Sequence, residues 1–324
     1  MRLPGSPAFR LLPLTFALLA ASAHTQAASP GDFPSKPIEV IVPYTAGGGV
    51  DAMARAFSKL ASEKMGQRWI VSNRDGAGGV VGFSQLANAK PDGYIIAFSP
   101  ASPLTNAPFI NEKMPYTNDK VQAVCQVFEN VFAIAVRQES PIKNLQDLLD
   151  AAKKNPGGVS YGHAGMASVG HLSMAAIERA TDVRFNSIAY RGDNPAMVDV
   201  MGGTLDFVAV GVGTLAGSKL RTLAVLSDRR HPALPNIPSV AEAGLPTNSK
   251  GLNGLFVPAG TPAPIVATYE KVCEEVANSP AFQDQMKALS QAGRYLNAKD
   301  FGALIDSTYK THQGLVPGLQ IGKP

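Results

Sequence analysis

The sequence predicts an α/β protein of two strand-and-helix series with a ligand cleft between them. Short apolar segments alternate with segments of helical periodicity through most of the chain, a pattern typical of parallel sheets covered by helices. Glycine-rich loops follow one strand in each half of the chain. The 324 residues are also enough for two domains of ordinary size.

The first series begins with an apolar strand at Ile38–Val42. This strand leads into the glycines of residues 43–49, after which apolar residues recur at helical spacing from Val50 to Ala61. Together with the elements that follow, this makes a βαβαβ unit. Those elements are a strand at residues 69–72, a helix from about Gly82 and a strand at residues 94–98.

The second series begins with a strand at residues 131–136. Asn144 is expected to cap the next helix, and Asn194 with Pro195 to begin a later one whose Met197, Val200 and Met201 face inward. The other expected strands are at residues 159–162, 186–189, 207–210, 223–226 and 254–257, and the other helices begin at about Val169 or lie at residues 263–277, 280–292 and 299–315.

The N-terminus has the features of a secretory signal peptide. Arg2 and Arg10 make the first ten residues positively charged, residues 11–23 are apolar, and small residues follow. We expect residues 1–27 to be removed after about Ala23 or Ala27, which places the mature protein in the periplasm. A retained membrane anchor is the alternative, although the apolar run is short for a span.

Composition excludes several classes of function. The net charge is +4, or +2 without Arg2 and Arg10, and no Lys/Arg cluster suggests a nucleic-acid partner. Cys125 and Cys273 can form one disulfide in an oxidising compartment or remain two buried thiols. Neither has histidines at ligand spacing, so we expect no metal site and no cofactor.

Two glycine-rich loops are candidate ligand sites. In residues 43–49, successive glycines let backbone N–H groups approach a ligand, and the following helix N-terminus favours an anion. A tight turn is the alternative, and no Lys-Ser/Thr pair follows to make a P-loop. Residues 162–170 occupy the equivalent place in the second series, where His163 and Ser168 add polar donors; His163 can also be a solvent-exposed loop histidine.

Other polar loops are weaker candidates. Residues 99–102 can supply hydroxyls, and Arg191 can pair with a ligand carboxylate or remain a solvated surface charge. Residues 76–79 fit a structural turn, because Val81 stands where a dinucleotide fingerprint needs its last glycine. Met166 stands where a nucleophile elbow around Ser168 needs glycine, so we expect no enzyme.

The chain resembles the Bug/TctC family, the periplasmic solute-binding receptors of tripartite tricarboxylate transporters. The resemblance runs in order from about Lys36 to the C-terminus. The segments that carry it are residues 36–51 (KPIEVIVPYTAGGGVD), 73–79 (NRDGAGG), 90–94 (KPDGY), 189–192 (AYRG), 240–246 (VAEAGLP) and 258–262 (PAGTP).

The resemblance implies a two-domain Venus-flytrap fold of the periplasmic binding protein type II class. Residues 33–135 and 251–324 would form one domain and residues 136–250 the other, with the ligand cleft between them. A small-molecule carboxylate would be bound by a monomer and passed to membrane transporter subunits of the tripartite tricarboxylate type. The expected ligand-binding residues are Tyr44, Thr45, Ala46, Gly47, Gly48, Ser99, Ser102, Thr105, His163, Ala164, Gly165, Ser168 and Arg191.

Three departures from the family's pattern bear on the ligand. His163 stands where serine is common and Arg191 where lysine is frequent, and both would suit a second carboxylate. We therefore expect a dicarboxylate, with aromatic acids of the phthalate type included. Residues 206–221 look shorter than the family's equivalent segment around residues 211–213. Alternatives are a secreted α/β hydrolase that acts on a carboxylate ester and a ligand sensor that feeds a signalling system.

Overall fold

The computed structural model describes Met1, residues 33–247 and residues 251–319. Apart from Met1, the expected signal peptide and its cleavage positions lie outside these residues. Within the described ranges, none of the helices has both the length and the apolar character needed to cross a membrane.

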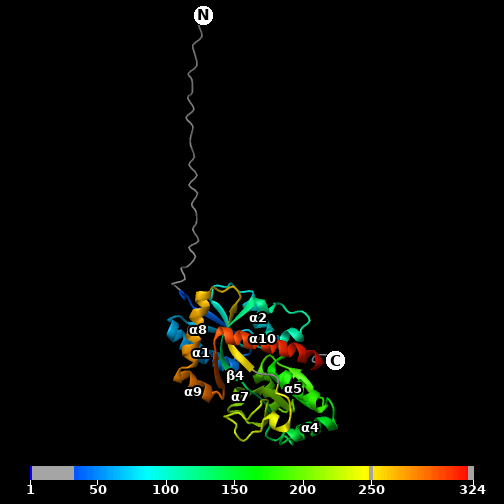
Figure 1. The fold of residues 1–324 in the computed structure, drawn as a ribbon. Helices are drawn as coiled ribbons and strands as arrows, with labels where there is room; N and C mark the ends of the chain where they lie inside the picture. Colours follow the sequence, from blue (N-terminus) through cyan, green and yellow to red (C-terminus); the bar gives the residue numbers. More distant parts are fainter. Residues whose placement is uncertain (2–32, 248–250, 320–324) are drawn as a thin grey trace. The chain divides into compact units, whose positions relative to one another are not determined.

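The first lobe is built on a six-stranded mixed sheet with the order β11-β4-β10-β3-β1-β2. Its parallel part is β1 between β2 and β3, and β10 and β11 complete the sheet through antiparallel pairing. Early and late segments of the chain, from β1 to β11, therefore lie in the same sheet (Figure 1). The strands are β1 Ile38–Val42, β2 Trp69–Asn73, β3 Ile95–Pro100, β4 Val121–Asn130, β10 Gly251–Pro258 and β11 Ala292–Leu296.

Helices cover both faces of this sheet because its strand residues alternate between two apolar cores. On one face Phe57 of α1 packs with its ring centroid 5.6 Å from both Phe98 and Phe282. On the other, Phe83 and Phe301 pack against Phe256. In Figure 1, α1, α8 and α9 lie beside one another. The helices are α1 Gly49–Met65, α2 Val80–Ala87, α3 Ser102–Thr105, α8 Ala263–Ala277, α9 Pro280–Ala288 and α10 Ala298–Leu315.

The second lobe is built on a five-stranded sheet with the order β7-β6-β8-β5-β9. Its alternating residues also form two cores, one beneath α4 and α5 and the other beneath α6 and α7. The strands are β5 Phe132–Arg137, β6 Ser160–His163, β7 Asn186–Ala189, β8 Phe207–Gly211 and β9 Leu220–Val225, and the helices are α4 Leu145–Lys154, α5 Val169–Thr181, α6 Asp193–Met201 and α7 Val212–Leu215.

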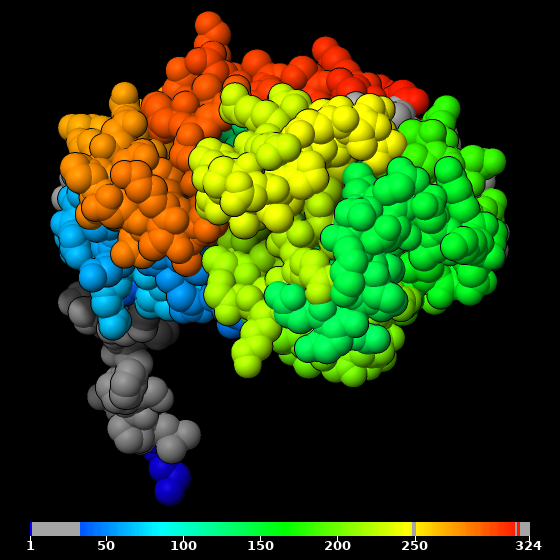
Figure 2. Space-filling model, turned by 90° about the horizontal axis from the view of Figure 1, so that it is seen from below, coloured from blue at the N-terminus to red at the C-terminus, as the bar shows by residue number. Residues whose placement is uncertain are grey.

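The chain passes from the first sheet to the second at Val131, between β4 and β5. It returns through the residues between β9 and β10, which include the short 3₁₀ helix Val240–Ala243. The yellow residues of this return segment are visible in Figure 2, and residues 226–232 line a surface cavity together with Arg294. The predicted division at residues 135/136 and 250/251 stays a prediction.

Two details of the predicted α6 were wrong. The helix begins at Asp193 with Gly192 as its N-cap, so Asn194 is its second residue and no cap. Gly192 is needed there because a Cβ atom would lie 2.3 Å from Thr45 Oγ1. Met201, expected to face inward, is 48% exposed.

The helix predicted at residues 280–292 is also too long. α9 ends at Ala288, and Ser290 adopts a left-handed φ of 51°, which interrupts the helix. Residues 292–296 then form β11, whose backbone groups pair with β4. Pairing with the edge of β4, which the sequence pattern does not reveal, favours this extended conformation.

Cys125 of β4 and Cys273 of α8 form a disulfide. The bridge joins segments 148 residues apart in the sequence and ties β4, the second strand from one edge of the sheet, to a covering helix. Of the two alternatives that the sequence left open, the structure has the bridge.

Candidate functional site

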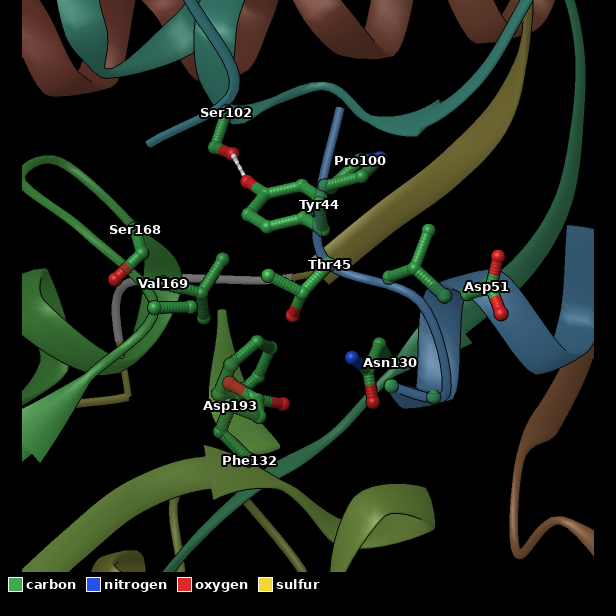
Figure 3. A pocket seen from close by; sticks show the side chains of 14 residues that line it. Tyr44, Thr45, Asp51, Pro100, Ser102, Asn130, Phe132, Ser168, Val169 and Asp193 are labelled. Carbon is green, nitrogen blue, oxygen red and sulfur yellow. Dashed lines mark hydrogen bonds between the residues drawn. The ribbon is translucent and has the colours of Figure 1, made fainter. Parts of the chain in front are cut away.

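A cavity lies where the loops of both lobes meet, at the ends of β1, β3, β4 and β6 (Figure 3). Its empty volume is about 470 Å³, part of which is open to solvent. The lining residues are Tyr44, Thr45, Gly48, Gly49, Val50, Asp51, Pro100, Ser102, Asn130, Phe132, Ala164, Ser168, Val169 and Asp193.

Tyr44 anchors the first-lobe loop. Its hydroxyl donates to the Gly78 carbonyl at 3.1 Å and lies 3.4 Å from Ser102 Oγ, the contact drawn in Figure 3. Burial raises the pKa of Tyr44 to about 12, so this side chain is a neutral phenol at any physiological pH. The Asn73 amide also donates to the Tyr44 carbonyl at 2.9 Å.

Asp51, in the first turn of α1, fixes the glycine turn of the same loop. Its carboxylate accepts from the Gly47 N–H at 2.8 Å, from Arg55 Nε at 2.9 Å and from Asn73 Nδ2 at 2.9 Å. Burial raises the pKa of Asp51, but these hydrogen bonds outweigh it and hold the pKa below its usual value. Asp51 is therefore an ionised support of the loop.

The N-termini of two helices face the cavity. Gly48 is the N-cap of α1, and the Gly49 N–H donates to Thr214 Oγ1 of the second lobe at 3.2 Å. Ser168 is the N-cap of α5, where its side chain accepts from the His171 N–H. Helix N-termini carry partial positive charge and unpaired N–H groups, so the two together favour an anion.

His163 and His171 lie behind the second-lobe loop and do not line the cavity. Their rings stack with centroids 4.2 Å apart, and His163 bonds to Gly165 through Nδ1 and to Ser187 through Nε2. Burial lowers the pKa of His163 to about 3, with a further contribution from His171, and lowers that of His171 to about 4. Both imidazoles are therefore neutral supports of the loop.

A third group of polar side chains comes from Thr45, Asn130 and Asp193. Figure 3 shows these three turned toward a common space. Asp193 Oδ2 accepts from the Gly211 N–H at 3.1 Å and from Thr214 Oγ1 at 3.0 Å. Asp193 Oδ1, Thr45 Oγ1 and Asn130 Oδ1 are buried atoms without a hydrogen-bond partner in the described part of the chain. Burial raises the pKa of Asp193, against the effect of its two hydrogen bonds.

Six of the thirteen expected ligand residues line this cavity: Tyr44, Thr45, Gly48, Ser102, Ala164 and Ser168. Ala46 and Gly47 lie in the same loop but are exposed, as is Arg191. Ser99 and Thr105 are buried and bond to neighbouring carbonyl groups. Gly165 packs against Gly78, and His163 lies as described above. The assignment of all thirteen stays a prediction.

Sequence reasoning missed Asn130 and Asp193. Asn130 ends β4 and Asp193 begins α6, so both positions follow from element boundaries that the sequence placed wrongly or not at all. An acidic residue in a first helical turn is common, and nothing in the sequence distinguishes Asp193 from that ordinary role. Within the described ranges, no group of three or more His, Cys, Asp or Glu residues is placed to hold a metal ion.

Loops of the two lobes touch each other around the cavity. Asn106 Nδ2 of the first lobe donates to the Ala167 carbonyl of the second at 2.9 Å. Gly78 approaches Met166 so closely that a Cβ atom on Gly78 would lie 2.2 Å from its carbonyl oxygen. With the Gly49–Thr214 bond, these contacts hold the lobes together in a closed arrangement.

Comparisons with known sequences assign the chain to a family. The family model described as "Tripartite tricarboxylate transporter family receptor" matches residues 53–320. A UPF0065 protein of a Pseudomonas species is 34% identical over 86% of this chain and 83% of its own length. A UPF0065 protein of Bordetella bronchiseptica is 33% identical over 91% of this chain and 88% of its own length.

Solved structures agree with this family and with the fold. A structure described as a periplasmic transporter is 30% identical, with a TM-score of 0.84 over 89% of this chain and 99% of its own. The periplasmic binding protein BugD is 28% identical, with the same TM-score and coverage. The fold is therefore the two-domain flytrap of periplasmic binding proteins, as predicted.

Proposed function

This chain belongs to the tripartite tricarboxylate transporter receptor family, and from that premise we propose that it captures a small organic carboxylate in the cavity between its lobes. The family consists of periplasmic solute-binding receptors, so the chain is a receptor and no enzyme. The ligand would leave the protein chemically unchanged.

The convergence of two helix N-termini carries this proposal. The α1 and α5 N-termini both contribute lining residues, Gly49 and Val50 from one and Val169 from the other. A carboxylate between them would accept backbone N–H groups from both lobes and meet partial positive charge on two sides. The hydroxyls of Thr45, Ser102 and Ser168 add neutral donors.

Cleft closure would couple binding to transport. A carboxylate that bonds to both helices stabilises the closed arrangement by its greater affinity for that state, and so shifts the population toward it. The contacts of Asn106 with Ala167 and of Gly49 with Thr214 indicate how the lobes meet in that state. The closed protein would then dock as a monomer on membrane subunits of the tripartite tricarboxylate type.

Export to the periplasm belongs to the same proposal. Cleavage after about Ala23 or Ala27 would release a mature chain whose discontinuous first domain spans residues 33–135 and 251–324 and whose inserted second domain spans residues 136–250. The Cys125–Cys273 disulfide fits an oxidising compartment.

The sequence predicts a second carboxylate on the ligand because His163 and Arg191 would suit it. Neither lines the cavity: His163 is fully buried with both ring nitrogens bonded, and Arg191 is exposed. The proposal therefore keeps one carboxylate as the defining group of the ligand and makes dicarboxylates, aliphatic and phthalate-type, one arm of its test.

Thermal unfolding of the mature protein with a panel of mono-, di- and tricarboxylates tests the proposal. A true ligand at 100 times its dissociation constant adds about 2.7 kcal/mol to the free energy of unfolding, so the melting temperature of the protein should rise. The compound should be recovered unchanged. The primary amide of each acid is the control, since it keeps the shape and loses the charge. No shift with any acid, or an equal shift with acid and amide, would contradict a carboxylate site.

A further inference from the structure

Asp193 is an acidic group of the cavity that the carboxylate proposal does not use. Its Oδ2 is bonded to the Gly211 N–H and to Thr214 Oγ1, and Thr214 Oγ1 in turn accepts the Gly49 N–H. These hydrogen bonds link Asp193 of the second lobe to Gly49 of the first and hold the carboxyl group in one orientation. Oδ1, the other oxygen, is buried and has no partner among the described residues, although the side chain lines the cavity (Figure 3).

The cavity offers Asp193 no positive charge. Its fourteen described lining residues include no lysine, arginine or histidine, and Asp51 and Asp193 are the charged ones. Asp51 is paired with Arg55 outside the cavity, whereas none of the interactions that shift the pKa of Asp193 involves a cation. A buried carboxylate oxygen without a donor is costly to a folded protein, and a ligand can provide the missing donor.

We propose, resting on the carboxylate-receptor function, that Asp193 selects carboxylates that also carry an ammonium group. The ligand carboxylate would lie at the two helix N-termini and the ammonium would donate to Asp193 Oδ1. Thr45 Oγ1 and the Asn130 amide face the same space and supply further partners. The protein would then be a receptor for amino-carboxylates, with Asp193 as a specificity-determining residue.

Charge separates this ligand class from dicarboxylates. A second carboxylate near Asp193 would place two acids together without a cation, which is unfavourable because Asp193 Oδ1 is buried. An ammonium in the same place pairs with the acid and with the unused oxygen at once. Because Oδ2 already accepts two hydrogen bonds, Oδ1 is the oxygen left to accept from an ammonium, and the positive charge of that group would favour the ionised form of Asp193 against the effect of burial.

Matched ligand pairs and one substitution test the inference. The pairs are L-alanine with propionate, L-aspartate with succinate, and 4-aminobutyrate with butyrate, measured by calorimetry on the mature protein. We expect at least one amino member to bind the wild type about 10- to 100-fold more tightly than its deaminated partner, the usual worth of a buried hydrogen bond to a charged group.

Asp193→Asn replaces the hydrogen-bond acceptor that faces the cavity with a donor. Its amide oxygen can take over the bonds from Gly211 and Thr214, so its NH₂ group faces the cavity as a donor. The preference for the amino member should disappear or invert toward the deaminated partner. Asp182→Asn is the matched control, because it removes one acidic charge from the same lobe at an exposed left-handed position that asparagine tolerates. If Asp193→Asn does not fold, Asp193→Ser removes the same charge with a smaller side chain.

The outcomes separate this inference from the proposed function. If the wild type prefers the amino member in none of the three pairs, or if Asp193→Asn keeps the wild-type preference, Asp193 does not select an ammonium and the inference fails, while the carboxylate receptor stands. A preference for succinate in the absence of any amino preference would mean that a protonated Asp193 donates to a ligand carboxylate. If no acid or amino acid in these pairs or in the carboxylate panel binds the wild type, the proposed function fails with the inference.

Discussion

The two lobes present the same feature to the cavity, a strand followed by a loop and a helix N-terminus, but they hold it in different ways. In the first lobe an ionised Asp51 bonds to Gly47, Arg55 and Asn73, and a disulfide ties the sheet to α8. In the second lobe two stacked neutral imidazoles, His163 and His171, lie behind the loop.

The difference shows that a loop before a helix N-terminus can be held in place by different kinds of interaction. The first lobe depends on a charge that must stay, since the hydrogen bonds to Asp51 favour its ionised form. The second depends on two groups that must remain uncharged, and on α5 packing closely over β8. Each means of support fails under different conditions, so each can be removed separately.

Removing the disulfide should have the largest effect on stability. Cys125→Ala with Cys273→Ala leaves the second lobe untouched and frees a loop of 148 residues in the unfolded chain. We expect a loss of about 2–5 kcal/mol in the free energy of unfolding, measured by urea titration. A reductant should lower the stability of the wild type alone. Equal stability of variant and wild type would show that the sheet needs no covalent tie.

Gly170, in the first turn of α5, should tolerate replacement by alanine less well than Gly48, the N-cap of α1. A Cβ atom on Gly170 would lie 2.2 Å from the Ala209 carbonyl oxygen, whereas one on Gly48 meets the Thr45 carbonyl at an ordinary 3.6 Å. Gly170→Ala must push α5 away from β8, at a cost of about 1–3 kcal/mol. Gly48→Ala, at a φ of −75°, meets no clash and should cost about 0.5–1 kcal/mol, because alanine is a poorer N-cap than glycine. Equal losses in the two variants would mean that the lobes are packed alike.

Much of the fold could be predicted because apolar periodicity is local. The expected bounds of α8 and β7 match the structure, as does the start of α5. β11 could not be predicted, because its conformation comes from pairing with the edge of β4 and its own residues are only partly buried.

The site was less predictable than the fold. Tyr44, Gly48 and Ser168 were expected at the cleft because loops after parallel strands meet at one edge of a sheet, and all three line the cavity. His163 was expected to face the ligand, yet its position as the last residue of β6 turns it into the lobe, where His171 and Ser187 enclose it. The direction of a side chain at a strand end depends on tertiary contacts that spacing does not encode.

The smallest expected effect is a difference in the pH dependence of stability. His163 and His171 have lowered pKa values in the folded protein, about 3 and about 4, against about 6.5 when unfolded. Between these values the unfolded chain binds more protons, so stability should fall as pH decreases below about 6.5. Each histidine should cost about 1 kcal/mol between pH 7 and pH 5.5.

His171→Asn isolates this contribution. The asparagine oxygen can still accept the Ala167 N–H that His171 Nδ1 accepts at 3.2 Å, but it takes up no proton. In urea titrations, the free energy of unfolding that the variant loses between pH 7 and pH 5.5 should be smaller by about 1 kcal/mol than the loss in the wild type. Asp51 should not obscure this window, because its lowered pKa delays the loss of its stabilisation to more acidic pH. An unchanged loss in His171→Asn would mean that the second-lobe loop does not depend on a neutral imidazole, and the contrast between the two lobes would then rest on packing and the disulfide alone.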